Sequence, residues 1–319
     1  MAGSDDHDTR EGVELTHLDE PLFNDAGATK RDLIEYLDGV RRRIIPVLEA
    51  RPLSVIRVHR GQEAFMQKNV PRYAPPWVPT VRYWAESSKR EVAYALCNDR
   101  RTLLWFANQR AVEYHPALVR ADRPDHMTHL ILDLDPPEGD AFSMAVRAAH
   151  LVREVLTQAG LAGAVKTSGA KGVHVFVPID DRSSMEDAAA ATRAIAHRAE
   201  RLDPGVATTA FVKEDRGGKV FVDSTRAGGA TVIAAYSPRV RPAVPVSFPV
   251  GWADLDNVTP ADFTLRSALE LLGDGDPWAE QMPGPQALPA ELVEEGRAIP
   301  VSRVQAMHEG LRRARDRRR

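Results

Sequence analysis

The most constraining feature of this chain is an apolar run that ends in two aspartates and two prolines: Leu130-Ile131-Leu132-Asp133-Leu134-Asp135-Pro136-Pro137. Proline has no N–H to give to a sheet, so the run predicts a β-strand that stops directly after Asp135. Side chains at i and i+2 point to the same face of a strand, so we expect Asp133 and Asp135 side by side.

Two adjacent carboxylates repel each other, and burial adds to the cost of keeping both charged. A divalent cation between them removes that cost, and hard oxygen ligands suit Mg²⁺ or Mn²⁺. The competing interpretation is a pair of exposed acids at a sheet edge, which is the commoner meaning of an isolated Asp-x-Asp. Other motifs in the chain must therefore decide between a metal site and a pair of exposed acids.

A second segment combines two glycines, two lysines, two hydroxyls and a histidine: Lys166-Thr167-Ser168-Gly169-Ala170-Lys171-Gly172-Val173-His174. Glycine permits positive φ and close backbone approach, and successive N–H groups in such turns form an anion nest. Lys171 adds a charge suited to phosphate, and His174 begins the next strand. This is not a Walker A loop. The alternative is an ordinary glycine hairpin with a solvated lysine.

A third acid ends another apolar run, Lys219-Val220-Phe221-Val222-Asp223. Three acids around two metal ions would stabilise both the attacking and the leaving oxygen of an in-line phosphoryl displacement. The alternative for Asp223 is a turn-initiating acid before Ser224. Arg239 and Arg241 follow, and arginine binds phosphate bidentately, although surface arginines are usually solvated.

Composition is that of a globular protein, with 43% hydrophobic and 27% charged residues among 319. The net charge of −3 does not indicate nucleic-acid binding, whereas the basic end, residues 311–319, is either a nucleic-acid contact or a solvated tail. Cys97 is the only cysteine, which excludes an intrachain disulfide and a cysteine-rich zinc site. No signal peptide or membrane span is visible, so we expect a cytoplasmic protein.

Hydrophobic periodicity predicts an α+β fold with helices against one face of a sheet. We expect a disordered N-terminus over residues 1–14, a catalytic domain over 15–272, and a C-terminal extension with a basic tail over 273–319. Helices are predicted over 29–49, 143–159 and 186–201, and strands over 53–59, 91–97, 102–106, 164–167, 174–179, 219–223 and 231–235.

Haloacid-dehalogenase-type phosphatases also place Asp-x-Asp at a strand end, but x-Thr or x-Ser follows the second aspartate there. Here Pro136 and Pro137 follow Asp135, and the three acids with the glycine-lysine-histidine turn fit nucleotidyl transfer better. In these motifs the chain resembles the polymerase domain of bacterial ligase D, a member of the archaeo-eukaryotic primase superfamily. Supporting matches, over about residues 14–270, are Thr29-Lys30-Arg31-Asp32-Leu33, Arg51-Pro52-Leu53-Ser54, Phe65-Met66-Gln67-Lys68, Val112-Glu113-Tyr114-His115 and Tyr236-Ser237-Pro238-Arg239. No ligase or phosphoesterase segment is visible, so the expectation is a stand-alone member.

The resemblance implies a primase-type fold, with central mixed sheets flanked by helices, and roles for the matched residues. It implies that Asp133, Asp135 and Asp223 are catalytic and bind two Mn²⁺ or Mg²⁺ ions. Nucleotide-binding roles are implied for His115, Ser168, Lys171, His174, Arg239 and Phe65, and DNA-binding roles for Lys30, Lys68 and Arg216. Within these sets, Phe65 would stack on a base and Lys30 would contact a 5′-phosphate across a gap.

Three positions depart from the family pattern. Glu20 stands where a lysine is usual, Met66 replaces the second of two aromatics, and Ser224-Thr225-Arg226-Ala227 replaces Trp-Ser-Gln-Asn. The first weakens 5′-phosphate recognition, the second weakens stacking, and the third alters contacts to the nucleotide or its sugar. The loop ahead of Asp133 is short, which argues against a role in bridging DNA ends.

The resulting hypothesis is a template-dependent polymerase that fills short gaps or extends ends in DNA repair and accepts ribonucleotides readily. A primer 3′-OH would attack the α-phosphate and release pyrophosphate. The alternatives are a primase that starts chains, a non-catalytic nucleic-acid-binding scaffold, and a metal-dependent phosphatase. Expected partners are DNA, NTP or dNTP, a Ku-like end-binding protein and a separate DNA ligase, with a monomer as the default.

Overall fold

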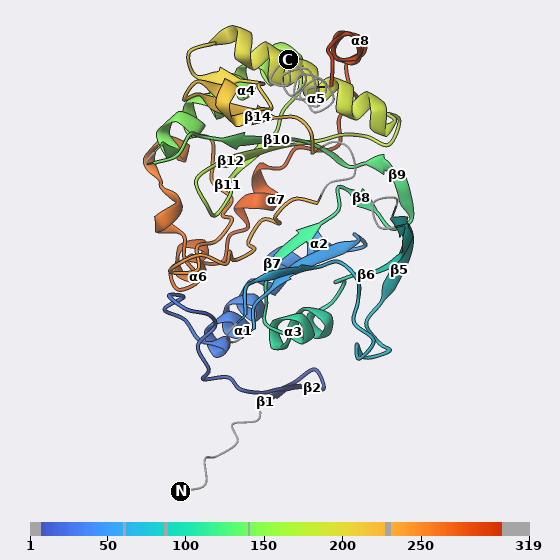
Figure 1. Ribbon diagram of the computed structural model, residues 1–319, viewed down its shortest axis with the longest axis vertical. Coiled ribbons are helices and arrows are strands. Elements are labelled where there is room, and N and C mark those ends of the chain that lie inside the picture. The colour runs from blue at the N-terminus through green and yellow to red at the C-terminus, as the bar shows by residue number, and fades with distance from the viewer. Residues whose placement is uncertain (1–7, 60–61, 86–88, 140, 227–230, 302–319) are drawn as a thin grey trace, which may run out of the picture.

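The protein consists of two stacked halves, each built on a β-sheet, in a computed structural model (Figure 1). The structure describes residues 8–59, 62–85, 89–139, 141–226 and 231–301. The predicted α+β class is confirmed, because helices and mixed or antiparallel sheets alternate along the chain. Among the described residues, no helix is both long and apolar enough to cross a membrane.

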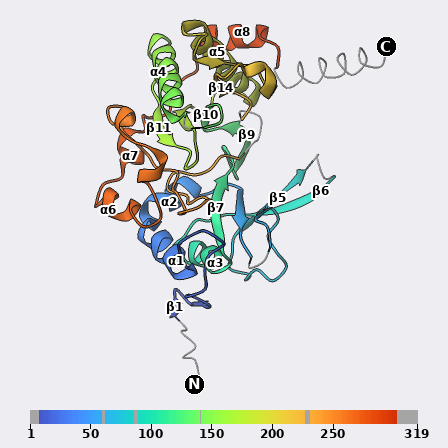
Figure 2. The ribbon, with the colours of Figure 1, turned by 60° about the vertical axis from the view of Figure 1, so that its left-hand side comes forward.

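The first half has a five-stranded sheet, with order β4-β3-β6-β5 and with β7 paired to β3 over its whole length. The hairpin of β5 and β6 projects sideways from the body (Figure 2). The elements of this half are α1 (Lys30–Gly39), α2 (Arg41–Leu48), β3 (Leu53–Arg57), β4 (Phe65–Gln67), β5 (Thr80–Ala85), β6 (Arg90–Ala95), α3 (Arg100–Asn108) and β7 (Ala111–Pro116).

The second half has a five-stranded sheet of order β11-β12-β10-β14-β13, in which only β13 and β14 run parallel. Helices α4 and α5 pack on one face, and α8 packs on α5 (Figure 1). Because side chains alternate along a strand, Leu132 and Leu134 turn to one face of β10 and Asp133 to the other. The elements of this half are β10 (His129–Asp135), α4 (Phe142–Gln158), β11 (Ala164–Thr167), β12 (Val173–Pro178), α5 (Met185–Leu202), β13 (Ala207–Thr208), β14 (Val220–Asp223) and α8 (Ala290–Ala298).

Shorter elements connect the two halves or decorate their edges. They are β1 (Asp8–Arg10), β2 (Val13–Leu15), β8 (Val119–Arg120), β9 (Arg123–Met127), the 3₁₀ helices η1 (Lys213–Arg216), η2 (Leu255–Asn257) and η3 (Pro260–Asp262), α6 (Ala268–Leu272) and α7 (Pro277–Gln281). Within the predicted extension, Trp278 is buried in the core and α8 packs on α5, so residues 273–301 adhere to the body. The predicted domain boundaries are otherwise untested, and the basic end lies outside the described residues.

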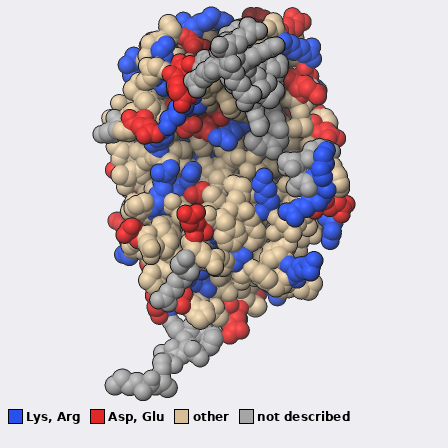
Figure 3. All heavy atoms as spheres, in the orientation of Figure 1, with Lys and Arg blue, Asp and Glu red and all other residues tan. Residues whose placement is uncertain are grey.

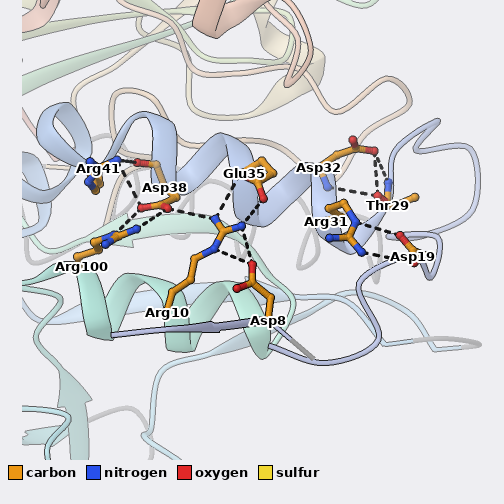
Figure 4. A network of polar contacts seen from close by, with 10 residues as sticks. All are labelled: Asp8, Arg10, Asp19, Thr29, Arg31, Asp32, Glu35, Asp38, Arg41 and Arg100. Carbon is orange, nitrogen blue, oxygen red and sulfur yellow. Dashed lines mark hydrogen bonds and ion pairs between the residues drawn. The ribbon is translucent and has the colours of Figure 1, made fainter. Parts of the chain in front are cut away.

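The expected disorder of residues 1–14 is wrong for the part that the structure describes. Residues 8–15 form the β1–β2 hairpin, and Leu15 is fully buried. Figure 4 shows how Arg10 reaches from this hairpin to the α1 carboxylates Glu35 and Asp38, while Arg100 of α3 also binds Asp38. These contacts join residues far apart in the sequence, so local composition could not predict them.

Three predicted elements differ from the structure. Residues 102–106 lie in helix α3, whose N-cap Asp99 accepts a hydrogen bond from the backbone N–H of Thr102. The predicted helix over 29–49 is two helices, which are divided at Val40. Val40 follows Gly39, and glycine is a poor helix former; the side chain of Leu269 packs against Gly39. Residues 231–235 form no regular strand; they run beside β7 through isolated backbone hydrogen bonds to Pro116 and Tyr114.

Candidate active site

Four polar residues form a row across neighbouring strands of the second sheet. The strand register sets Lys166 opposite His174, His174 opposite Asp133, and Asp133 opposite Asp223. Residues directly opposite in a sheet share a face, so the row projects away from α4 and α5. The predicted strand ends are confirmed, and the sheet brings the first and third acids together.

The row begins with a buried lysine that orients the histidine. The Lys166 Nζ lies 3.0 Å from His174 Nδ1 and 2.5 Å from Ser247 Oγ. His174 Nε2 lies 3.1 Å from Asp133 Oδ1, and an ionised carboxylate can only accept, so the neutral imidazole carries its proton on Nε2 and its Nδ1 accepts from Lys166. Burial and the Lys166 charge lower the pKa of His174 to about 4, so the ring is neutral at physiological pH.

Arg226 joins the two opposed acids. Its Nη2 lies 3.0 Å from Asp133 Oδ2 and its Nε lies 3.4 Å from Asp223 Oδ2. Thr225 donates to the other oxygen of Asp223 from its backbone N–H and its hydroxyl. Burial raises the pKa of Asp133, but His174 and Arg226 outweigh burial and hold that pKa below its usual value.

Asp135, two residues along β10, is in the opposite situation. Burial and the neighbouring charge of Asp133 raise its pKa, and Lys171 and Arg226 only partly oppose them. A cation beside this carboxylate would relieve the repulsion, and three carboxylates are the ligands that Mg²⁺ and Mn²⁺ prefer, so the residues fit these ions. In the described part of the chain, however, no three acidic, histidine or cysteine side chains already converge at metal-ligand spacing.

The turn between β11 and β12 differs in detail from the predicted anion nest. The backbone N–H groups of Ala170 and Gly172 donate to Ser168 Oγ, at 3.2 and 3.1 Å. The hydroxyl therefore keeps its own proton to donate, and Ser168 lines a cavity together with Lys171. Gly172 is required here, because an added Cβ would collide with the Leu134 carbonyl oxygen.

Glu113 on β7 connects two of the predicted nucleotide-binding residues. Its Oε2 lies 2.9 Å from His115 Nε2, and its Oε1 lies 3.2 Å from Arg239 Nε and 2.9 Å from the backbone nitrogen of Val240. Burial raises the pKa of Glu113, but His115 and Arg239 outweigh it and leave the pKa below its usual value. Arg239 also donates to the Ser168 carbonyl at 2.9 Å, which links the two halves of the protein.

These residues surround one cavity of about 220 Å³. Seven of the predicted catalytic and nucleotide-binding residues line it and an eighth borders it, and their roles remain predictions. The lining includes His115, Asp133, Asp135, Ser168, Lys171, His174, Arg226, Arg239 and Arg241, while Asp223 borders it through Arg226.

The other predicted contacts lie elsewhere. Phe65 on β4 is 39% exposed and stacks on His59 with ring centroids 5.5 Å apart. Lys68, just after β4, is exposed. Arg216 lies over the Phe221 ring, its guanidinium carbon 3.9 Å from the centroid. These three side chains are available on surfaces outside the cavity.

Lys30 is the least accessible of the predicted DNA-binding residues. It is 3% exposed, and its ammonium donates to the Thr16 carbonyl oxygen at 2.5 Å. Burial and the nearby Arg110 lower its pKa to about 8. Glu20, the reversed charge noted in the sequence, lies 3.1 Å from Arg110 Nη1 and so forms an ion pair rather than an isolated acid.

Sequence reasoning missed the roles of three residues that organise the cavity. Lys166 stands at an inward position of an apolar strand, which is a signal for a buried, paired charge. Arg226 was noted only as a departure from the family pattern, and Glu113 only as part of a motif. The contacts of all three cross the sheet or the two halves, so no local pattern predicts which residues they pair with.

The comparisons with known proteins place this fold and site in the primase-polymerase class. The chain belongs to the LigD primase-polymerase domain family, whose model matches residues 29–278. The bifunctional non-homologous end joining protein LigD of Bacillus subtilis is 32% identical over 289 residues, which are 88% of this chain and 46% of the relative. The multifunctional non-homologous end joining DNA repair protein LigD of Mycobacterium tuberculosis is 33% identical over 276 residues, 83% of this chain and 36% of the relative. The chain thus spans less than half the length of these curated relatives.

A solved structure shows the same fold. The polymerase domain from Mycobacterium tuberculosis ligase D, in complex with DNA, superposes with a TM-score of 0.78 at 32% identity. The match covers 85% of this chain and 97% of that domain. The predicted family is therefore confirmed.

Proposed function

We propose that this protein is a template-dependent nucleotidyltransferase that extends primer ends or fills short gaps during DNA repair by end joining. The observation that carries the proposal is that carboxylates and cations line one cavity of about 220 Å³. Asp133 and Asp135 line it and Asp223 borders it, and Lys171 and Arg239 line the same cavity. Carboxylates together with cations are what a nucleoside triphosphate with divalent ions requires.

Each side chain has a defined task in the proposed reaction. The three aspartates hold two Mn²⁺ or Mg²⁺ ions, which would stabilise charge on the phosphoryl oxygens during attack by the primer 3′-OH. Ser168 donates its hydroxyl proton to a phosphate oxygen, and Lys171 and Arg239 neutralise the triphosphate. His115, fixed by Glu113, faces the same cavity. His174 orients Asp133 through its Nε2, so its task is to position a carboxylate as well as to border the triphosphate.

DNA binding rests on local groups rather than on bulk charge. Basic and acidic side chains are interspersed over the face in Figure 3. We propose Phe65 as a base-stacking surface and Lys68 and Arg216 as backbone contacts, supported by the DNA complex of the related polymerase domain. Lys30 is proposed to contact a 5′-phosphate, with ribonucleotides accepted readily, and a Ku-like protein and a DNA ligase are proposed partners.

The test is nucleotide addition to a short-gapped duplex with Mn²⁺, comparing a 5′-phosphate with a 5′-hydroxyl at the gap and NTP with dNTP. Addition that favours the 5′-phosphate supports gap filling and the Lys30 contact. Addition that ignores the phosphate removes the Lys30 role but keeps the polymerase. If no nucleotide is added to any primer, and dinucleotides form on single-stranded template instead, the protein is a primase and the gap-filling proposal is wrong.

A further inference from the structure

Arg226 makes the most unusual contact in the cavity. Its guanidinium bridges Asp133 and Asp223, the two aspartates that face each other across β10 and β14. His174 and Thr225 contact one oxygen of each carboxylate, Asp133 Oδ1 and Asp223 Oδ1. Arg226 faces the other two: its Nη2 donates a hydrogen bond to Asp133 Oδ2 at 3.0 Å, and its Nε forms an ion pair with Asp223 Oδ2 at 3.4 Å without a hydrogen bond. The bridge therefore uses the same oxygens that a divalent cation shared by the two carboxylates would need.

Arg226 and such a cation exclude each other for two reasons. Both are positive, so they repel when placed on one carboxylate pair at low local dielectric. Both also occupy the same place, because the guanidinium lies between the two carboxylates, 3.0 Å from Asp133 Oδ2 and 3.4 Å from Asp223 Oδ2. Occupation by one therefore weakens occupation by the other.

The position of Arg226 allows it to leave. It lies three residues beyond the end of β14, outside regular secondary structure, and its side chain is 38% exposed. Thr225, in contrast, is fixed by two hydrogen bonds to Asp223, so the strand end stays in place when the arginine turns away. The half-exposed guanidinium can turn into solvent or toward the cavity that it lines.

We propose that Arg226 is an internal counter-cation: it neutralises Asp133 and Asp223 in the metal-free protein and is displaced when a divalent cation binds them. Arg226 thereby sets the metal concentration that the enzyme needs. This inference rests on the proposed function, because it takes the two carboxylates as metal ligands. It predicts that Arg226 competes with the ion: the arginine stabilises the metal-free protein and lowers the affinity for the metal.

The test is Mn²⁺ binding to the whole protein without nucleotide or DNA, followed by electron paramagnetic resonance of the free ion. Arg226→Gln should bind Mn²⁺ about tenfold more tightly than the wild type, within the usual range of coupling between two sites. The metal-free variant should melt at a lower temperature, because two buried carboxylates lose their partner, and Mn²⁺ should raise its melting temperature more than that of the wild type. Arg226→Lys keeps a charge but cannot bridge two carboxylates with a planar fork, so its affinity should fall between the two.

Two controls separate the possible failures. Arg182→Gln removes an exposed arginine that pairs with Asp180 outside the cavity, and it should leave Mn²⁺ affinity unchanged. Asp133→Asn should abolish tight Mn²⁺ binding; if it binds as the wild type does, the metal role of the carboxylates fails and the proposed function is wrong. If Asp133→Asn loses Mn²⁺ but Arg226→Gln and Arg226→Lys bind no more tightly than the wild type, only the counter-cation role is overturned.

Discussion

Replacing Glu113 by glutamine tests whether one buried carboxylate organises the nucleotide side of the cavity. The change keeps the shape and removes the charge that faces His115 at 2.9 Å and Arg239 at 3.2 Å. Hydrogen bonds to charged groups contribute about 1 kcal/mol more than neutral ones, so the two weakened hydrogen bonds, from His115 and from the Val240 backbone N–H, cost about 2 kcal/mol. The glutamine NH₂ must also face one of the donors that Glu113 now accepts from, which adds about 1 kcal/mol. We expect a loss of about 3 kcal/mol in the free energy of unfolding, in line with removal of one partner of a buried pair.

Urea unfolding measures this loss, and titration with a non-hydrolysable NTP analogue measures its consequence. Affinity should fall about tenfold, equivalent to about 1.4 kcal/mol, because His115 and Arg239 lose their fixed orientation. Glu91→Gln is the matched control, since Glu91 is exposed and pairs with Arg82 at only 3.8 Å. If Glu113→Gln has the same unfolding free energy and the same affinity for the analogue as the control, Glu113 does not position His115 and Arg239.

Three further outcomes follow from the structure. Burial and Arg51 lower the pKa of His129 from 6.5 to about 3, so between these pH values the unfolded chain binds more protons than the folded protein, and stability falls as pH drops. His129 should therefore reduce the free energy of unfolding by about 2 kcal/mol between pH 7 and pH 5. In urea unfolding, His129→Gln should make this difference between the two pH values smaller. Gly172→Ala should destabilise the protein by about 2 kcal/mol through its collision with the Leu134 carbonyl, whereas Gly284→Ala, with open space around the position, should not; thermal melting compares them. Lys166→Met should leave His174 Nδ1 without its donor while Asp133 still accepts from Nε2, so the nitrogen resonance of Nδ1 should shift in nuclear magnetic resonance and the tautomer should stay; an unchanged Nδ1 resonance would contradict the assigned hydrogen bond.

The parts of the site that sequence predicted are those with a local signature. An apolar run interrupted by Asp133 and Asp135 and closed by prolines specifies both a strand and its end, and the glycine turn at Ser168 specifies a hairpin. The third acid followed from the same pattern, and the strand register then placed Asp223 opposite Asp133. The metal, nucleotide and DNA roles of these residues remain predictions.

The parts that sequence could not predict depend on distant contacts or on ambiguous patterns. Short apolar runs fit a helix and a strand equally well, so residues 102–106 and 231–235 were assigned wrongly. The order of residues 8–15 depends on Arg10 meeting Glu35 and Asp38 on another element. Glu113, Lys166 and Arg226 acquire their partners only when strands or halves come together.

The measurement that tests the central claim most directly is primer extension by the wild type and by Asp135→Asn, on one primer–template with Mn²⁺ and NTP. Asparagine keeps the size of Asp135 and removes a negative charge that Asp133 and Asp223 repel, so the variant should be at least as stable as the wild type in urea unfolding. The account predicts extension by the wild type and a loss of at least about 100-fold in the variant, since a metal ligand contributes several kcal/mol to the transition state. Extension by Asp135→Asn at the wild-type rate would contradict it.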